Sequence, residues 1–160
     1  MERAGLRRAL LGHRAEDEVE EGHRQAMLAL LAGEEDPFHR ASYRPGHVTA
    51  SAFVVSPDGG RVLLIWHAKL LRWLQPGGHL EAGDADVVAA ALREVAEETG
   101  LVSVDRLGEG LLDVDVHVIP ARKGEPEHRH FDARVALRAR VEAVVAGDDA
   151  LAARWVAWEE

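Results

Sequence analysis

The segment PGGHLEAGDADVVAAALREVAEETGL, Pro76 to Leu101, constrains this chain more than any other part of it. Glu94, Glu97 and Glu98 stand at i, i+3 and i+4, so a helix would place all three carboxylates on one face. Like charges at this spacing repel each other by about a few tenths of a kcal/mol per pair. The pattern therefore indicates a role for the carboxylates other than helix stability.

The same segment has the start, the end and the apolar face of a helix. Asp86 is a good N-cap, and Gly100 is a good C-terminal stop. The apolar side is expected to be a stripe of Val88, Ala91, Leu92, Val95 and Thr99. At 100° per residue this stripe centres roughly 130° from the glutamates. The helix is therefore expected to bury the stripe and to present its carboxylates on the other side.

The residues before this helix add a second indication of function. The stretch QPGGHLEAGD contains three glycines, which allow backbone carbonyls to approach a ligand closely. Carboxylates and carbonyls are the hard oxygen ligands that Mg²⁺ and Mn²⁺ prefer. Mg²⁺ shares its coordination shell with water and substrate phosphate, which suits attack on a phosphate chain. A solvated acidic helix face is the alternative interpretation.

The range Gly78–Leu101 resembles the Nudix box, in which a glycine, five residues, a glutamate and seven residues precede REUxEExGU, U being aliphatic. The second half, REVAEETGL, matches throughout. The first half is one residue longer than the pattern, and its mid-motif glutamate is missing. Counting forward from the first glycine gives Asp84, and counting back from the arginine gives Ala85. We interpret this as a one-residue insertion, with Asp84 as a partial substitute.

The resemblance implies a Nudix-like α/β/α sandwich with a mixed sheet. It also implies metal-dependent hydrolysis of a pyrophosphate bond in a nucleoside diphosphate linked to another moiety. By position, Glu94, Glu97 and Glu98 would hold Mg²⁺ or Mn²⁺ together with the Gly78 carbonyl. Arg93 would orient a glutamate, and Glu97 is its i+4 neighbour.

Glu94 is the expected general base, with Glu98 or Glu127 as alternatives. Two functions other than hydrolysis are also compatible with the sequence. The altered first half of the box suits a Nudix-like sensor that binds a nucleotide or metabolite without turnover. An acidic interaction module without a small-molecule site is the other.

Two further segments, LLDVDVHVI and HRHFDARVAL, alternate polar and apolar residues as half-buried strands do. Pairing them as a hairpin with His117 opposite His128 would also oppose Asp115 to His130. The polar residues gathered would be Asp113, Asp115, His117, His128, His130 and Asp132. Such a group predicts a substrate site or a second metal site, unless it is an ordinary solvated sheet face. His79, in the glycine-rich loop, is a candidate for a phosphate contact.

Residues 1–45 are predicted to be an N-terminal helical extension packed on the domain, and residues 46–160 the Nudix hydrolase domain. Helical spacing covers 15–32, with a short helix expected around 6–11. Strands are expected at 47–55, 61–67, 102–104, 111–119, 130–141 and 153–160. This order lacks strict βαβ alternation, so it favours an α/β fold with a mixed sheet.

The amino-acid composition limits the classes of binding partner and the cellular location that we expect. Lys+Arg 19 against Asp+Glu 28 gives a net charge of −9, which predicts no affinity for nucleic-acid polymer or anionic membrane. The negative charge is compatible with a small phosphorylated substrate, because a bound cation would supply the positive charge that the substrate requires. The absence of cysteine excludes disulfides, zinc–thiolate sites and a cysteine nucleophile. No apolar run reaches the roughly 20 residues of a membrane span, so a cytoplasmic protein is expected, either monomer or homodimer.

Overall fold

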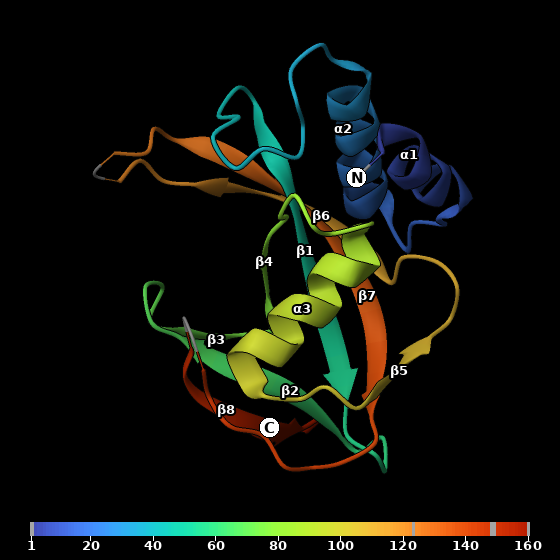
Figure 1. Cartoon of the computed structure of the whole chain (residues 1–160). Helices are drawn as coiled ribbons and strands as arrows, with labels where there is room; N and C mark the ends of the chain where they lie inside the picture. Colours follow the sequence, from blue (N-terminus) through green and yellow to red (C-terminus); the bar gives the residue numbers. More distant parts are fainter. Residues whose placement is uncertain (1, 123, 148–149, 160) are drawn as a thin grey trace.

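The computed structural model describes residues 2–122, 124–147 and 150–159, which form a mixed β-sheet with three helices (Figure 1). The helices are α1 Arg3–Gly12, α2 Glu18–Ala32 and α3 Val87–Thr99. The strands are β1 Gly46–Val55, β2 Arg61–His67, β3 Arg72–Leu74, β4 Gly77–His79, β5 Val104–Leu107, β6 Asp113–Ile119, β7 His128–Ala139 and β8 Ala150–Ala157. The expected α/β class is confirmed. The short strands β3 and β4 were not predicted, because three residues show no periodicity.

The sheet is built around β1 and β7, which run parallel from the Gly46–Arg129 pair to the Val55–Arg138 pair. Its order is β3-β2-β1-β7-β5, with β4 beside β1, β6 beside β7 and β8 beside β2. The other pairings are antiparallel. This mixture is the mixed sheet that the element order predicts.

The two faces of the central strands differ in chemistry. One face is apolar and belongs to the buried core, with Val48, Ala50, Ala52, Val54, Phe131, Ala133, Val135 and Leu137. Successive side chains of a strand point to opposite faces, so the residues between these lie on the other face. That polar face carries His47, Thr49, Ser51, His130, Asp132 and Arg134.

Helices α1 and α2 pack onto the same core. Leu6 and Leu10 of α1 and Met27 and Leu31 of α2 are buried with the apolar face of the sheet. Glu20 of α2 also accepts a hydrogen bond of 3.2 Å from the backbone N–H of Val114 in β6, which satisfies an edge donor. The division into an extension and a domain stays a prediction. None of the described helices is long and apolar enough to cross a bilayer.

Helix α3 begins and ends as its sequence predicts. The Asp86 side chain accepts a 2.9 Å hydrogen bond from the Ala89 N–H, and Gly100 takes the left-handed conformation with φ 67°. In Figure 1, α3 lies across the sheet beside β4 and β1.

The predicted orientation of α3 was wrong in one respect. Its buried residues are Val87, Ala90, Ala91, Val95, Glu98 and Thr99, whereas Leu92 of the predicted stripe is 37% exposed. Glu98 is only 3% exposed, because α3 turns its carboxylates toward the glycines of β4. The Gly77 N–H donates a 3.0 Å hydrogen bond to Glu98 Oε2, which satisfies the buried carboxylate.

The β6–β7 hairpin forms, but its register differs by two residues from the expected one. His117 opposes His130, Asp115 opposes Asp132, and Asp113 opposes Arg134. A shift of two residues leaves every side chain on the same face, so the alternating pattern cannot distinguish the two registers. The observed register places an arginine among the aspartates, where opposite charges stabilise the pairing.

Replacing Gly77 by alanine is expected to lower the free energy of unfolding by about 1–3 kcal/mol or more. A Cβ at this position would lie 2.4 Å from Ser51 Cβ and 2.7 Å from the Ala50 carbonyl oxygen, so β4 could not keep its place beside β1. The measurement is urea unfolding. The matched control is Gly22→Ala in α2, where no atom lies within 4 Å of the added methyl group. That change is expected to raise stability by about 0.5–1 kcal/mol, and equal effects of the two changes would contradict the prediction.

Candidate functional site

Arg93 of α3 is the centre of the first group of predicted residues. Its guanidinium donates to Asp84 at 3.2 and 3.0 Å, to Glu94 at 3.0 Å and to Glu97 at 2.9 Å. It also donates to the backbone carbonyl of His79 at 2.8 Å. The carboxylate of Asp84, with those of Glu94 and Glu97, raises the pKa of Arg93 against the effect of burial. One cation thus joins the loop, the helix and β4.

Asp84 is buried against this arginine, with 7% of its surface exposed. Burial would raise the pKa of Asp84, but hydrogen bonds from Arg93 and from the Glu81 N–H outweigh it and hold the pKa below its usual value. Ala85 is exposed. Of the two positions that the motif alignment allows for the missing glutamate, the structure therefore places Asp84 at Arg93.

Two of the three carboxylates of α3, those of Glu94 and Glu98, lie against the glycines of β4. A Cβ on Gly78 would come within 2.6 Å of Glu94 Oε1, so the glycine is what lets this carboxylate approach the strand. Burial raises the pKa of Glu94, although Arg93 opposes the shift. Glu98 accepts the N–H of Gly77, whereas the Glu97 side chain is 42% exposed. The structure thus brings Gly78, Glu94 and Arg93 together.

These residues suit a hard divalent cation by their donor chemistry. Glu94, Glu97 and Glu98 offer carboxylate oxygens, and Gly78 lacks the side chain that would fill the space beside Glu94. Mg²⁺ is held in proteins by one or two carboxylates, with water and substrate phosphate completing the shell. The three glutamates do not form a compact cage. Among the described residues, the group whose potential ligand atoms all lie within 4.8 Å of one another consists of His47, His79 and His130.

The predicted aspartates of the polar face are held by an arginine. Arg134 donates to Asp132 at 3.0 Å, to Asp113 at 2.6 Å and to Asp115 at 3.0 Å. Burial opposes the charge on Arg134, but the three carboxylates outweigh it and raise its pKa. Asp132 also accepts hydrogen bonds from the hydroxyls of Thr49 at 3.0 Å and Ser51 at 2.6 Å. The register expected from the sequence opposed Asp115 to His130, whereas in the structure Asp115 opposes Asp132 and pairs with His117 at 2.8 Å. The role of Arg134 was not predicted.

The histidines of the polar face form a cluster above these aspartates. The ring of His47 lies 4.8 Å from that of His130, 5.1 Å from that of His79 and 5.1 Å from that of His128, between centroids. His117 lies at the border, 5.6 Å from His130. Burial, with the neighbouring imidazoles, lowers the pKa of His79 to about 4 and that of His130 to about 2. Burial also lowers the pKa of His47. These three imidazoles are therefore neutral at pH 7.

His47, Thr49, Ser51 and Arg134 were not among the residues predicted from the sequence, and His79 was predicted only as a phosphate contact. A signal was present for the first three, because polar residues alternate along the start of β1. Arg134 continues the two-residue alternation of His130 and Asp132 along β7, so it lies on the same face of the strand as they do. Glu127, an alternative base, is exposed in the loop before β7.

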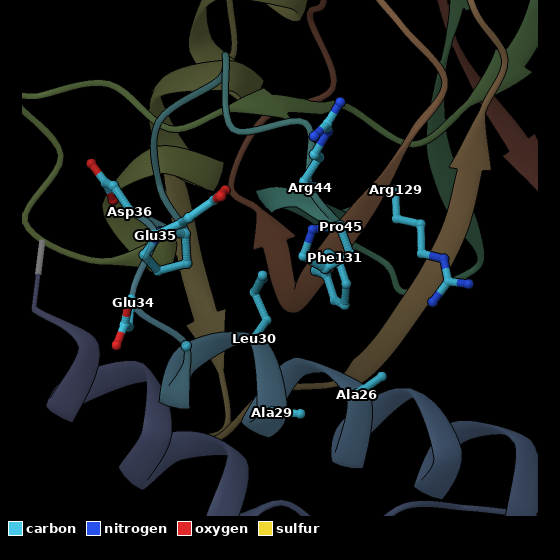
Figure 2. Close-up of a pocket in the computed structure, with 13 residues that line it drawn as sticks. Ala26, Ala29, Leu30, Glu34, Glu35, Asp36, Arg44, Pro45, Arg129 and Phe131 are labelled. Atoms are coloured by element: carbon cyan, nitrogen blue, oxygen red, sulfur yellow. The ribbon is translucent and has the colours of Figure 1, made fainter.

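A pocket of about 410 Å³ lies elsewhere, between the end of α2 and the starts of β1 and β7 (Figure 2). Leu30 and Phe131 contribute apolar walls, while Glu34, Arg44 and Arg129 bring charges to it. None of the predicted site residues lines it. The hollow is therefore separate from both groups described above.

Comparisons with known proteins agree with this geometry. The family model of the NUDIX domain matches residues 45–160. A NUDIX-family hydrolase from Clostridium perfringens is 27% identical, with a TM-score of 0.53 over 71% of this chain and 82% of that chain. A MutT NUDIX hydrolase from Burkholderia pseudomallei is also 27% identical, with a TM-score of 0.53 over 71% of this chain and 84% of that chain.

A third structure, an Ap4A hydrolase from C. elegans, shares the fold at 19% identity and a TM-score of 0.51, over 70% of this chain and 80% of that chain. A search of curated proteins found no match. The chain belongs to the Nudix family. It is a hydrolase of Nudix type that acts on pyrophosphate bonds, and the expected Nudix fold is confirmed.

Replacing Asp84 by asparagine is expected to lower the free energy of unfolding by about 1–3 kcal/mol. The change leaves the partly buried Arg93 without the carboxylate that binds it through both oxygens. Chemical denaturation measures this free energy of unfolding. The control is Glu81→Gln, at a neighbouring exposed position, whose free energy of unfolding is expected to lie within about 0.5 kcal/mol of that of the native chain. Adding Ala85→Glu to the Asp84 variant should not restore stability, because residue 85 points to solvent. If Ala85→Glu did restore stability, residue 85 and not residue 84 would occupy the position of the missing motif glutamate.

Stability is expected to fall as the pH is lowered from 7 to 5. Unfolded histidine has a pKa near 6.5, whereas the folded value for His130 is about 2, so below about pH 6.5 the unfolded state binds protons that the folded state does not. The loss from His130 is up to about 1.4 kcal/mol per pH unit. Urea unfolding at several pH values should show a smaller slope for His130→Asn. An exposed control, His39→Asn, should keep the slope of the native chain, and an unchanged slope in His130→Asn would refute this account.

Proposed function

We propose that this Nudix hydrolase uses Mg²⁺ or Mn²⁺ to cleave the pyrophosphate bond of a nucleoside diphosphate linked to another moiety. Glu94, Glu97 and Glu98 would hold the cation, with the backbone carbonyl of Gly78. The observation that carries the proposal is the contact between the Glu94 carboxylate and the side-chain-free Gly78, directly beside Arg93. This arrangement brings carboxylate and backbone oxygens close together, as a site for a hard cation requires.

When bound, the cation would neutralise the phosphate oxygens and increase the electrophilicity of phosphorus. The protein supplies the positions of the oxygen ligands. Arg93 holds Glu94 and Glu97 from one nitrogen, at 3.0 and 2.9 Å, while Asp84 holds Arg93 in turn. Arg93 is thus a positioning residue, and its own charge offsets part of the repulsion among the glutamates.

Glu94 is the best candidate for the general base that takes a proton from the attacking water. Burial raises its pKa, which brings a carboxylate closer to the basicity that proton transfer at neutral pH favours. Glu98 is already an acceptor for the Gly77 N–H. Glu127 is exposed in a loop. Its position therefore supports a role as general base less well than the partly buried position of Glu94 beside Arg93 does.

The substrate class follows from charge as well as from the family. A chain with net charge −9 can bind a small polyanion where a cation is shared, but it repels a long one. The proposal therefore concerns a small phosphorylated molecule and not a nucleic-acid polymer or a membrane. A cytoplasmic location and a homodimer stay predictions from the sequence.

The test is hydrolysis of a panel of nucleoside triphosphates, dinucleoside polyphosphates, nucleotide sugars and ADP-ribose, with Mg²⁺, with Mn²⁺ and with chelator. We expect turnover that requires the cation and that the double change Glu97→Gln/Glu98→Gln reduces by about two orders of magnitude or more. Glu109→Gln, at an exposed carboxylate, is the matched control and should keep full activity.

Melting curves of each variant would separate loss of fold from loss of chemistry. Nucleotide binding without turnover across the panel would favour the sensor function instead. Turnover that is unaffected by chelator and by the double change would contradict the proposed cation site.

A further inference from the structure

Three histidines outside the carboxylate group converge on one point. His47 of β1, His79 of β4 and His130 of β7, here called the imidazole trio, each place a ring nitrogen within 4.8 Å of the other two. Their strands are neighbours: His130 opposes His47 across the β1–β7 pair, and His79 opposes Thr49 across the β1–β4 pair. Pyrophosphate hydrolysis at the carboxylates does not require this convergence.

The hydrogen bonding of His47 indicates a ligand at this point. Its Nδ1 donates to the Ser42 carbonyl at 3.1 Å, so Nε2 carries the lone pair. His47 is 1% exposed. Among the buried side-chain nitrogen and oxygen atoms of the described residues, its Nε2 is the one that has no hydrogen-bond partner. Leaving such an acceptor unsatisfied costs about 1–3 kcal/mol. Metal-bound histidines have this arrangement, with the other ring N–H donating to a backbone carbonyl.

We propose that His47, His79 and His130 bind a Zn²⁺ ion, at a site distinct from the carboxylate site for Mg²⁺. Imidazole nitrogen is a preferred ligand of zinc, whereas Mg²⁺ prefers oxygen. Zinc with three protein ligands keeps a fourth position for water or a substrate oxygen. Tetrahedral Zn–N bonds of about 2.0–2.1 Å separate the nitrogens by about 3.3 Å, so the rings must close slightly, through the soft χ2 torsion of histidine.

The neighbouring groups do not compete for this role. Asp132 and Asp115 accept hydrogen bonds from Arg134, so these carboxylates already have a cationic partner. His128 donates from Nδ1 to the Pro126 carbonyl at 2.8 Å and lies outside the 4.8 Å group. His117 is exposed and pairs with Asp115 at 2.8 Å. The site is therefore a three-imidazole site, not the mixed histidine–aspartate site that the sequence predicts.

The two metal sites would lie on opposite sides of β4. Gly78 faces Glu94 of α3, because a Cβ there would meet that carboxylate. His79, the next residue, faces His47, with ring centroids 5.1 Å apart. Adjacent residues of a strand point to opposite faces, so one short strand separates the oxygen ligands from the nitrogen ligands. Arg93 bonds to the His79 carbonyl and connects the two groups.

The experiment is calorimetric titration of Zn²⁺ alone into the chelator-treated full chain. We expect one equivalent of zinc per chain, and binding weaker by at least about tenfold in His79→Gln and in His130→Gln. These two are partly exposed, which makes their loss less damaging to the fold than loss of the buried His47. His117→Gln is the matched control, since it removes an imidazole beside the trio and should leave zinc affinity unchanged. Far-ultraviolet circular dichroism and melting curves verify the fold of each variant.

Two further measurements separate this site from the carboxylates. The double change Glu97→Gln/Glu98→Gln should keep its zinc, and millimolar Mg²⁺ should not displace it. Co²⁺ in place of zinc should give the visible absorption of a tetrahedral ion in the native chain and lose it in His130→Gln. The absence of zinc binding, or equal affinity in the native chain and the two trio variants, would overturn the proposal. Because no substrate is used, this outcome is independent of whether the chain cleaves the proposed nucleotides.

Discussion

The hydrogen bonds of Arg93 are the constraint on which the arrangement around α3 depends. A guanidinium keeps its charge in proteins and presents its donors in a fixed plane. Here those donors reach Asp84 in the loop, Glu94 and Glu97 in the helix and the His79 carbonyl in β4. The three segments are consequently held in one relative position. The same cation offsets the repulsion at two of the three glutamates, Glu94 and Glu97, whose spacing would otherwise be unfavourable.

The glycines of β4 have the complementary role. Gly78 lacks the side chain that would keep Glu94 of α3 away from the strand, and Gly77 lacks the one that would collide with Ser51 of β1. Glu94 and Glu98 therefore turn toward β4, where the Gly77 N–H donates to Glu98. Shielding raises the pKa of Glu94, which brings the carboxylate closer to the basicity that proton transfer at neutral pH favours. The packing of the motif thus depends on the absence of side chains at these two glycines as much as on the charged residues.

Several features could be predicted from the sequence because they depend on neighbours within a few residues. The bounds of α3 follow from Asp86 and Gly100, and the alternation of β6 and β7 is visible in their polar residues. The predictions that failed concern longer distances. The apolar pattern of α3 could not show that glycines would accept Glu98 on the buried side. The hairpin register could not be chosen, because registers that differ by two residues present the same faces.

The sequence by itself determined the α/β class, the family and the carboxylates with their common helix face, since the spacing of charges along a helix is a local property. Tertiary structure alone decided that Asp84 and not Ala85 meets Arg93, and that Arg134 donates hydrogen bonds to three aspartates. It also brought His47, His79 and His130 to one point. Those residues lie on strands that are far apart in the chain, and their meeting depends on which strands pair and in which register. Strand pairing is set by burial of the whole sheet, which no local pattern encodes.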